Sequence, residues 1–167
     1  QEGSIEAYEA VIYGLLMSGL AMQMIGSSRP ASGGEHHISH LIEVEPDGLA
    51  VHSTALHGEK VGVGTVLASA EYHRLAEMED ISGAANEKEC LAGVTEDALI
   101  RAWPKIRQII SEIPEPEAVE GLLKQIGAKH CLPDIGVAEE KRVELLDWSP
   151  LIRNRLTLMR IRRMIRH

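Results

Sequence analysis

Helical periodicity runs along almost the whole chain and limits the folds that it can adopt. Apolar residues recur three and four positions apart, as they do on one face of an α-helix, for example at Leu99, Trp103, Ile106 and Ile110. We find no segment in which apolar and polar residues alternate as in a half-buried strand. The sequence therefore predicts an all-α fold without the alternating strands and helices of a nucleotide-binding sheet.

The length of the chain limits how many domains it can form. Its 167 residues suffice for one compact domain with one sizeable core, but not for a nucleotide domain beside a catalytic domain. Phenylalanine is absent and aromatic residues make up only 3% of the chain, so the core has to be built from Leu, Ile, Val, Ala and Met. We therefore expect residues 1–167 to form a single helical domain.

Capping and turn residues predict where the helices begin and end. Ser32 and Glu35 have the S-x-x-E spacing of a capping box, which indicates that a helix starts there. Thr95 is expected to cap a later helix that contains Pro104. The remaining helices are expected over residues 4–25, from His57 onward, from about 114 to Gly127, from about 137 and from about 149, with a loop or short helical piece at 81–93.

The apolar run AVIYGLLMSGLAMQMIG, residues 10–26, is the only segment that resembles a membrane span. It is short for one and is interrupted by Gly14, Ser18 and Gln23, so we predict a buried core helix instead. Acidic residues precede the run where a signal peptide would carry positive charge. A cytoplasmic location is expected, and it suits Cys90 and Cys131, which lack the spacing of a metal motif.

The charge of the chain is uneven. The net charge is −8, which disfavours a nucleic-acid partner, yet the segment from Arg153 onward contains six arginines and no acid. A basic tail of this kind could contact RNA or a membrane surface. We interpret it instead as the cationic end of a terminal helix, where positive charge is favoured by the helix dipole.

Four histidines in two neighbouring segments are candidates for metal binding. In RPASGGEHHISHLIE, residues 29–43, His36 and His40 lie four apart and share one face of a helix, whereas His37 points elsewhere. His57 opens the next helix and could add a further imidazole ligand. No glutamate lies between His36 and His40 as in the H-E-x-x-H motif, which excludes that metalloprotease pattern. Spacing alone leaves open whether these histidines bind a metal or only form hydrogen bonds.

Polar residues ahead of the histidines could bind an anion. Arg29 and Ser32 lie near the start of the second helix, where free N–H groups favour a phosphate. Ser32 could equally only cap the helix, and Arg29 could pair with a surface acid. The glycines Gly58, Gly62 and Gly64 do not form a dinucleotide-binding loop, and close packing of helices explains them better.

Three segments, SSRPASGGEHHISHLIE, LHGEKVGVGT and IRNRLTLMRI, together resemble the C-terminal part of the sn-glycerol-1-phosphate dehydrogenase family. This family is related to glycerol dehydrogenases, iron-containing alcohol dehydrogenases and dehydroquinate synthases. The resemblance implies the multi-helix C-terminal domain of the dehydroquinate synthase-like fold, with the N-terminal nucleotide-binding domain absent from this chain.

The resemblance also implies an activity and a set of site residues. The enzyme would reduce dihydroxyacetone phosphate to sn-glycerol 1-phosphate with NADH or NADPH. By resemblance, His36 and His57 bind a divalent zinc, nickel or iron ion, and His40 faces the substrate. Arg29 and Ser32 would help to bind the phosphate, and the protein would form a homodimer without a membrane span.

The sequence also departs from the family pattern. The family has a third metal ligand, an aspartate well ahead of the first histidine, but only 35 residues precede His36 here. The domain that binds most of the NAD or NADP is not in the chain either, so the fragment should be inactive alone. The alternatives are a glycerol dehydrogenase, a 3-dehydroquinate synthase, or a non-catalytic helical domain that docks through its first helix or its arginine tail.

Overall fold

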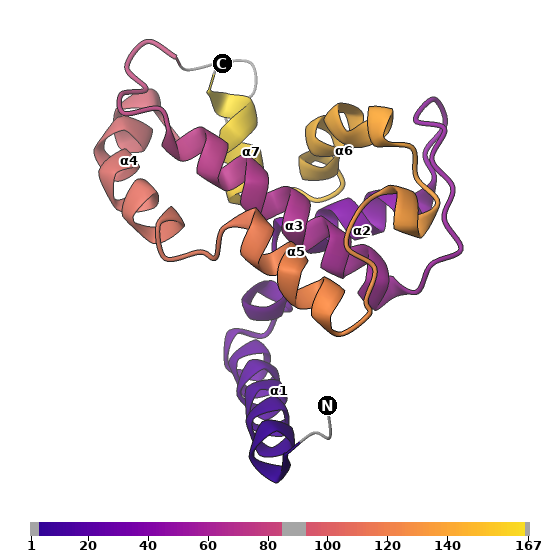
Figure 1. Ribbon diagram of the computed structural model, residues 1–167. Helices are drawn as coiled ribbons and strands as arrows, with labels where there is room; N and C mark the ends of the chain where they lie inside the picture. Colours follow the sequence, from indigo (N-terminus) through magenta and orange to yellow (C-terminus); the bar gives the residue numbers. More distant parts are fainter. Residues whose placement is uncertain (1–3, 85–92, 166–167) are drawn as a thin grey trace. The chain divides into compact units, whose positions relative to one another are not determined.

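The computed structural model describes residues 4–84 and 93–165, and within these residues the fold is all-α, as predicted. Contacts divide the chain into a first unit that ends at Gly33 and a second that begins at Gly34. The helices, with short 3₁₀ helices marked η, are α1 (Ile5–Ile25), η1 (Arg29–Ala31), α2 (Gly34–Val44), α3 (His57–Ala76), α4 (Glu96–Ile110), α5 (Pro116–Gln125), η2 (Pro133–Ile135), η3 (Glu139–Lys141), α6 (Arg142–Trp148), η4 (Ser149–Leu151) and α7 (Leu158–Met164) (Figure 1).

Helix α1 forms most of the first unit. Ser4 caps it by accepting a hydrogen bond from the Ala7 N–H, and Gly26 ends it with a left-handed φ of 66°. None of its residues is buried within its own unit, so the expected role as a buried core helix stays a prediction. This 21-residue helix contains an 18-residue window with a mean hydropathy of 1.3, which is sufficient by length and composition for a membrane span, a test that soluble core helices and signal sequences also pass.

The second unit contains two apolar clusters built from the expected aliphatic residues. The larger cluster lies where α2 packs against α3 and α6, with Ile38, Leu67 and Leu145 among its buried members. The smaller cluster surrounds Trp103 of α4, whose indole N–H donates a hydrogen bond of 2.8 Å to the Met78 carbonyl oxygen. The helical stripe that predicted α4 therefore does face a core.

Several helix boundaries differ from the predictions. Helix α2 begins at Gly34 rather than after a capping Ser32, and the Glu35 carboxylate contacts the His36 ring at 2.8 Å. Thr95 caps α4 as predicted, through a hydrogen bond from the Ala98 N–H. The last two helices begin later than expected, at residues 142 and 158. Much of the piece expected at 81–93, including Cys90, lies outside the described residues, as does Arg166.

The arginine-rich end of the chain contributes to the interior. Arg162 of α7 is only 6% exposed, and its guanidinium donates hydrogen bonds to the carboxylates of Glu71 on α3 and Asp147 on α6. Glu71 also accepts a 2.6 Å hydrogen bond from Arg74. The tail is therefore more than a cationic helix end, because one of its charges is buried in an ion-pair network.

Gly64 permits the close approach of α2 and α3 (Figure 1). A Cβ atom at Gly64 would lie 2.7 Å from the backbone carbonyl oxygen of Glu35, which is far inside van der Waals contact. The prediction that close helix packing explains the glycines of this segment is thus confirmed at Gly64. It is wrong at Gly58, where a Cβ would meet nothing within 4 Å.

We expect Gly64→Ala to lower the free energy of unfolding by about 1–3 kcal/mol, because rigid backbone has to move to make room for the methyl group. Chemical denaturation followed by circular dichroism measures this change. Gly121→Ala on α5 is the matched control, since a Cβ there has free space. It should be neutral or stabilising by up to about 1 kcal/mol through helix propensity. Equal stability of the two variants would contradict the packing role of Gly64.

Candidate functional site

Three of the predicted histidines come together at the contact between α2 and α3. The ring centres of His36 and His40 on α2 are 6.3 Å apart. His57, the first residue of α3, places its ring centre 5.6 Å from that of His36 and 5.5 Å from that of His40. His37, in contrast, is fully buried, and neither of its ring nitrogens has a hydrogen-bond partner within the described residues.

Local structure explains why these three rings meet. His36 and His40 are four residues apart, so they lie one above the other on the same face of α2. His57 is held at the start of α3, where the Glu59 carboxylate accepts a 2.8 Å hydrogen bond from the Leu56 N–H. The packing at Gly64 then brings the two helices close enough for the rings to be neighbours.

Carboxylates hold one nitrogen of each ring. One oxygen of Glu43 lies 2.8 Å from Nδ1 of His57, and its other oxygen lies 3.1 Å from Nδ1 of His40. Glu35 lies 2.8 Å from Nδ1 of His36. A neutral imidazole that donates its Nδ1–H to a carboxylate keeps a lone pair on Nε2, which is the arrangement typical of metal-binding histidines.

The charge on Glu43 is favoured by its surroundings. Partial burial acts to raise the pKa of its carboxyl group, but the hydrogen bonds and charge of His57, the hydrogen bond of His40 and the charge of Lys60 outweigh this and lower the pKa. Lys60 is only 7% exposed, and its Nζ lies 3.9 Å from Glu43. Glu43 is therefore a fixed anion that orients two imidazoles at neutral pH.

The ring spacing is wider than that of imidazoles that share one metal ion, and the ring nitrogens of His36, His40 and His57 do not all lie within 4.8 Å of one another. Imidazoles that share one ion through nitrogens at about 2 Å have ring centres roughly 5 Å apart. The observed separations of 5.5–6.3 Å are slightly wider, so the rings would have to move closer by a small amount. Two or three imidazoles with oriented Nε2 atoms make a donor set that suits zinc, nickel or iron.

Glu43 is a site residue that was not predicted from the sequence. A signal was present, because Glu43 follows His40 by three positions and His36 by seven, which places it on the same helical face. Ser39, also on α2, lies 3.3 Å through its Oγ from Nδ1 of His57 and was missed too. Spacing could have proposed Glu43 as a partner of His40, but its contact with His57 requires the packing of α2 on α3.

The two predicted phosphate-binding residues belong to the first unit. Arg29 is the first residue of η1, and its N–H lies 3.5 Å from the Oγ of Ser27. Ser32 follows η1 directly in extended conformation. The histidines lie in the second unit, and so the role of Arg29 and Ser32 stays a prediction.

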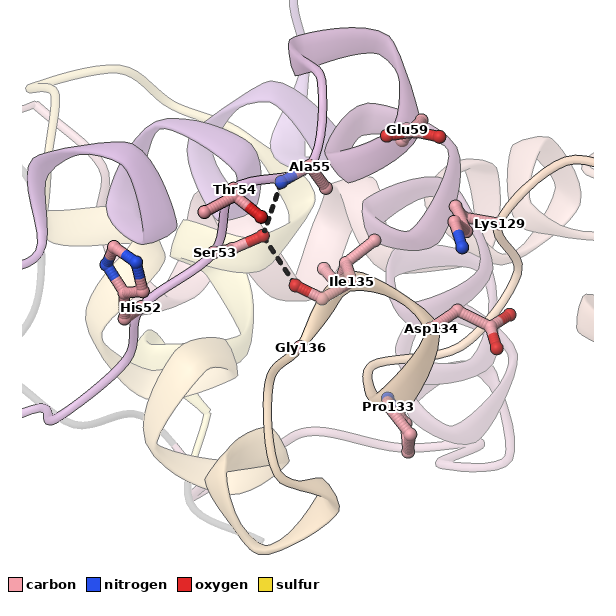
Figure 2. A pocket seen from close by; sticks show the side chains of 10 residues that line it. All are labelled: His52, Ser53, Thr54, Ala55, Glu59, Lys129, Pro133, Asp134, Ile135 and Gly136. Carbon is pink, nitrogen blue, oxygen red and sulfur yellow. Dashed lines mark hydrogen bonds between the residues drawn. The ribbon is translucent and has the colours of Figure 1, made fainter.

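A polar cavity of about 530 Å³ lies beside the segment that leads into α3 (Figure 2). The chain segment at Ser53 and the turn at Ile135 form two of its walls, and they are joined by a hydrogen bond from the Ser53 hydroxyl to the Ile135 carbonyl oxygen. Glu59, Lys129 and Asp134 supply its charged groups. None of the three clustered histidines lines this cavity.

Comparison with known proteins identifies relatives, although no family model matches the chain. Glycerol-1-phosphate dehydrogenase [NAD(P)+] of Halalkalibacterium halodurans is 35% identical over 146 residues, which are 87% of this chain and 35% of that protein. The protein of the same name from Bacillus subtilis is 33% identical over 151 residues, 88% of this chain and 34% of that protein. A third, from Pyrococcus abyssi, is 46% identical over 65 residues, 39% of this chain and 17% of that protein. The chain thus spans about a third of the length of the first two relatives.

Proposed function

Because the chain belongs to the glycerol-1-phosphate dehydrogenase family, we propose that it supplies the metal- and substrate-binding part of an enzyme that reduces dihydroxyacetone phosphate to sn-glycerol 1-phosphate with NADH or NADPH. The observation that carries this proposal is the cluster of three histidines whose Nδ1 atoms face carboxylates. In such a cluster the Nε2 atoms of the three rings remain available as donors to a metal ion or a substrate.

His36 and His57 are the proposed ligands of a divalent zinc, nickel or iron ion, and His40 is the proposed substrate contact. When bound, the ion would polarise the substrate ketone as a Lewis acid while reduced nicotinamide supplies the hydride. Glu43 holds His57 and His40 in one orientation through its two oxygens, so the two rings are positioned together. His40 can then present its Nε2 to a substrate hydroxyl.

Phosphate binding, cofactor binding and oligomeric state also belong to the proposal. Arg29 and Ser32 are proposed to bind the phosphate of the substrate. NAD or NADP is proposed to bind mainly to the nucleotide-binding domain that members of the family have. The enzyme is further proposed to be a cytoplasmic homodimer. Other reactions of the related enzymes, glycerol oxidation and 3-dehydroquinate synthesis, are the competing proposals.

A docking role is the candidate from a different class. It is favoured by one observation, the exposed apolar side chains of α1, such as Leu15 at 68% and Leu16 at 67%. A purely docking domain would not need three histidines held by carboxylates. Metal binding by the 167-residue chain itself therefore separates the two ideas, and it can be measured by calorimetric titration with nickel or zinc.

The activity test uses the chain extended at its amino terminus by the part that its relatives possess. Oxidation of NADH and NADPH is followed with dihydroxyacetone phosphate as substrate, after loading with zinc, nickel or iron. We expect turnover that a chelator abolishes and that added metal restores. Metal-dependent turnover with free glycerol or with the dehydroquinate synthase substrate, and not with dihydroxyacetone phosphate, would replace the proposed reaction by one of its competitors.

A further inference from the structure

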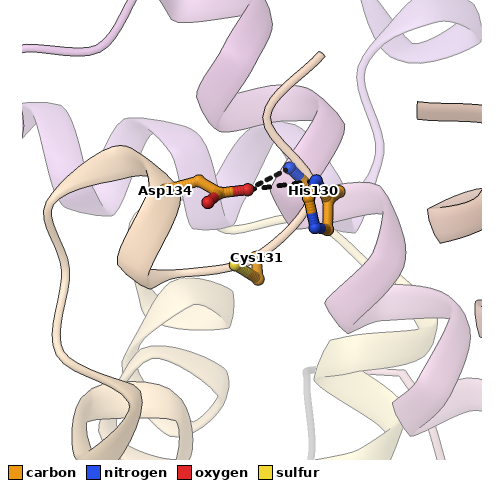
Figure 3. A group of neighbouring side chains, drawn as sticks. All are labelled: His130, Cys131 and Asp134. Atoms are coloured by element: carbon orange, nitrogen blue, oxygen red, sulfur yellow. Dashed lines mark hydrogen bonds and ion pairs between the residues drawn. The ribbon is translucent and has the colours of Figure 1, made fainter. Parts of the chain in front are cut away.

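A second group of metal-binding side chains lies in the connection between α5 and α6, apart from the histidine cluster. His130, Cys131 and Asp134 each offer one donor atom, and these three atoms all lie within 4.8 Å of one another (Figure 3). All three residues are partly exposed, so an ion could reach them from solvent. Neither the proposed reaction nor the family resemblance uses any of them.

The backbone holds these residues in a defined turn. The His130 N–H donates a 3.1 Å hydrogen bond to the Asp134 carboxylate, and His130 Nδ1 lies 3.1 Å from the same oxygen. Leu132 and Ile135, on either side of Pro133, are 0% and 2% exposed and anchor the turn in the larger core cluster. The three donors are therefore brought together by a packed segment, which lowers the entropy lost on binding an ion.

The chemistry of the three donors matches that of zinc. An imidazole nitrogen, a thiolate sulfur and a carboxylate oxygen are its usual ligands, and three protein ligands leave one position for water or another ligand. Donor atoms at 2.0–2.3 Å from one tetrahedral ion are about 3–4 Å apart, so separations below 4.8 Å require only small movements. A hard ion such as magnesium would not prefer the sulfur.

The surrounding charges favour a dication. Burial raises the pKa of the Cys131 thiol, and the negative charges of Asp134 and Glu139 act in the same direction, against a backbone hydrogen bond that lowers it. The same negative charges attract a divalent ion, which displaces the thiol proton. The amine of Lys124, which lines the neighbouring cavity, is engaged by Glu120 at 2.6 Å.

Space for an ion and its fourth ligand lies next to this group. A cavity of about 270 Å³ is lined by Lys124, Gly127, Ala128, Lys129, His130 and Asp134. Two of the three donor residues therefore face an opening. We propose that His130, Cys131 and Asp134 form a second site for a zinc-like divalent cation, which fixes the turn that they form between α5 and α6.

Cobalt(II) tests this site on the 167-residue chain, because a cobalt–thiolate bond gives a charge-transfer band in the near ultraviolet. The cluster of His36, His40 and His57 contains no sulfur and cannot give that band. The titration uses a Cys90→Ser, His36→Ala, His57→Ala background, which removes the other cysteine and the first metal site. We expect a thiolate band that saturates at one cobalt per chain, and zinc should displace the cobalt.

Cys131→Ser should abolish the band, and Asp134→Asn should weaken cobalt binding about tenfold or more, since a neutral amide is a poorer ligand. Zinc should raise the melting temperature of the background protein but not that of the Cys131→Ser variant, with circular dichroism confirming that both are folded. His52→Ala is the control, because this exposed histidine lies outside both clusters. No thiolate band with the folded background protein at saturating cobalt, or a band unchanged by Cys131→Ser, would overturn the proposal. Neither outcome would affect the proposed dehydrogenase site.

Discussion

Replacing His57 with alanine in the amino-terminally extended chain is expected to lower kcat/KM for dihydroxyacetone phosphate by about a thousandfold or more. A metal ion supplies several kcal/mol of charge stabilisation in a transition state, and each factor of ten in rate corresponds to about 1.4 kcal/mol. His57 contacts Glu43 and lies at the centre of the cluster, so its loss removes both a ligand and part of the site's organisation. Steady-state kinetics with metal in excess measures the effect.

Two further variants test the same ligand assignment, one by weakening the site and one by leaving it intact. Glu43→Gln keeps the shape of the side chain but removes the charge that holds His40 and His57, so we expect metal affinity to fall about 10–100-fold. His52→Ala is the matched control, because its side chain is 74% exposed and pairs with Glu45 at the surface. Its kcat/KM should be unchanged. Full metal-dependent turnover by the His57→Ala enzyme would refute the ligand assignment.

Glu71→Gln is expected to lower the free energy of unfolding by about 3–5 kcal/mol, because it leaves buried Arg162 with an incomplete set of anionic partners. The side chains of Glu71 and Arg162 are only 9% and 8% exposed, so water cannot replace the lost partner. This loss is a large part of the stability of a typical domain. Urea denaturation at neutral pH measures it.

The surface pair of Glu120 and Lys124 provides the control for this variant. Their side chains are 33% and 53% exposed, so Glu120→Gln should change the free energy of unfolding far less than Glu71→Gln does. If the two glutamine variants were equally stable, the buried network would not support the packing of α7.

The effect of Glu71→Gln should also depend on pH. Burial acts to raise the pKa of Glu71, but hydrogen bonds from Arg74 and Arg162 and their charges outweigh it and lower the pKa below its ordinary value of 4.5. A carboxyl group with a lowered pKa in the folded state stabilises that state fully above its unfolded pKa. The stability difference between wild type and variant should therefore be constant above about pH 5.5 and shrink as the pH falls below 4.5.

Much of the fold could be predicted from local sequence patterns. The apolar spacing around Trp103 predicted α4, and Thr95 predicted its start, because both signals act within a few residues. The role of α1 could not be predicted this way. Its composition suits a core helix, a membrane span or a docking helix equally, and none of its residues is buried here.

The candidate site, like the fold, could be predicted from the sequence only in part. The four-residue spacing of His36 and His40 placed them on one face of α2, and the resemblance singled out His57 as their partner. Glu43 was missed, because its second contact, to His57, joins residues 14 positions apart. The turn at His130, Cys131 and Asp134 was missed as well, since its spacing matches no common metal motif and its geometry comes from the packing of Leu132 and Ile135.

The sequence by itself determined that this protein is helical, that Thr95 caps α4, and that His36 and His40 share a face, because these features follow from the backbone period and from contacts within a few residues. The tertiary structure alone decided that Glu43 bridges His40 and His57, that Arg162 is buried against Glu71, and that Gly64 lies against the backbone of Glu35. These contacts join separate helices, and their formation depends on how whole helices pack, which no local pattern specifies.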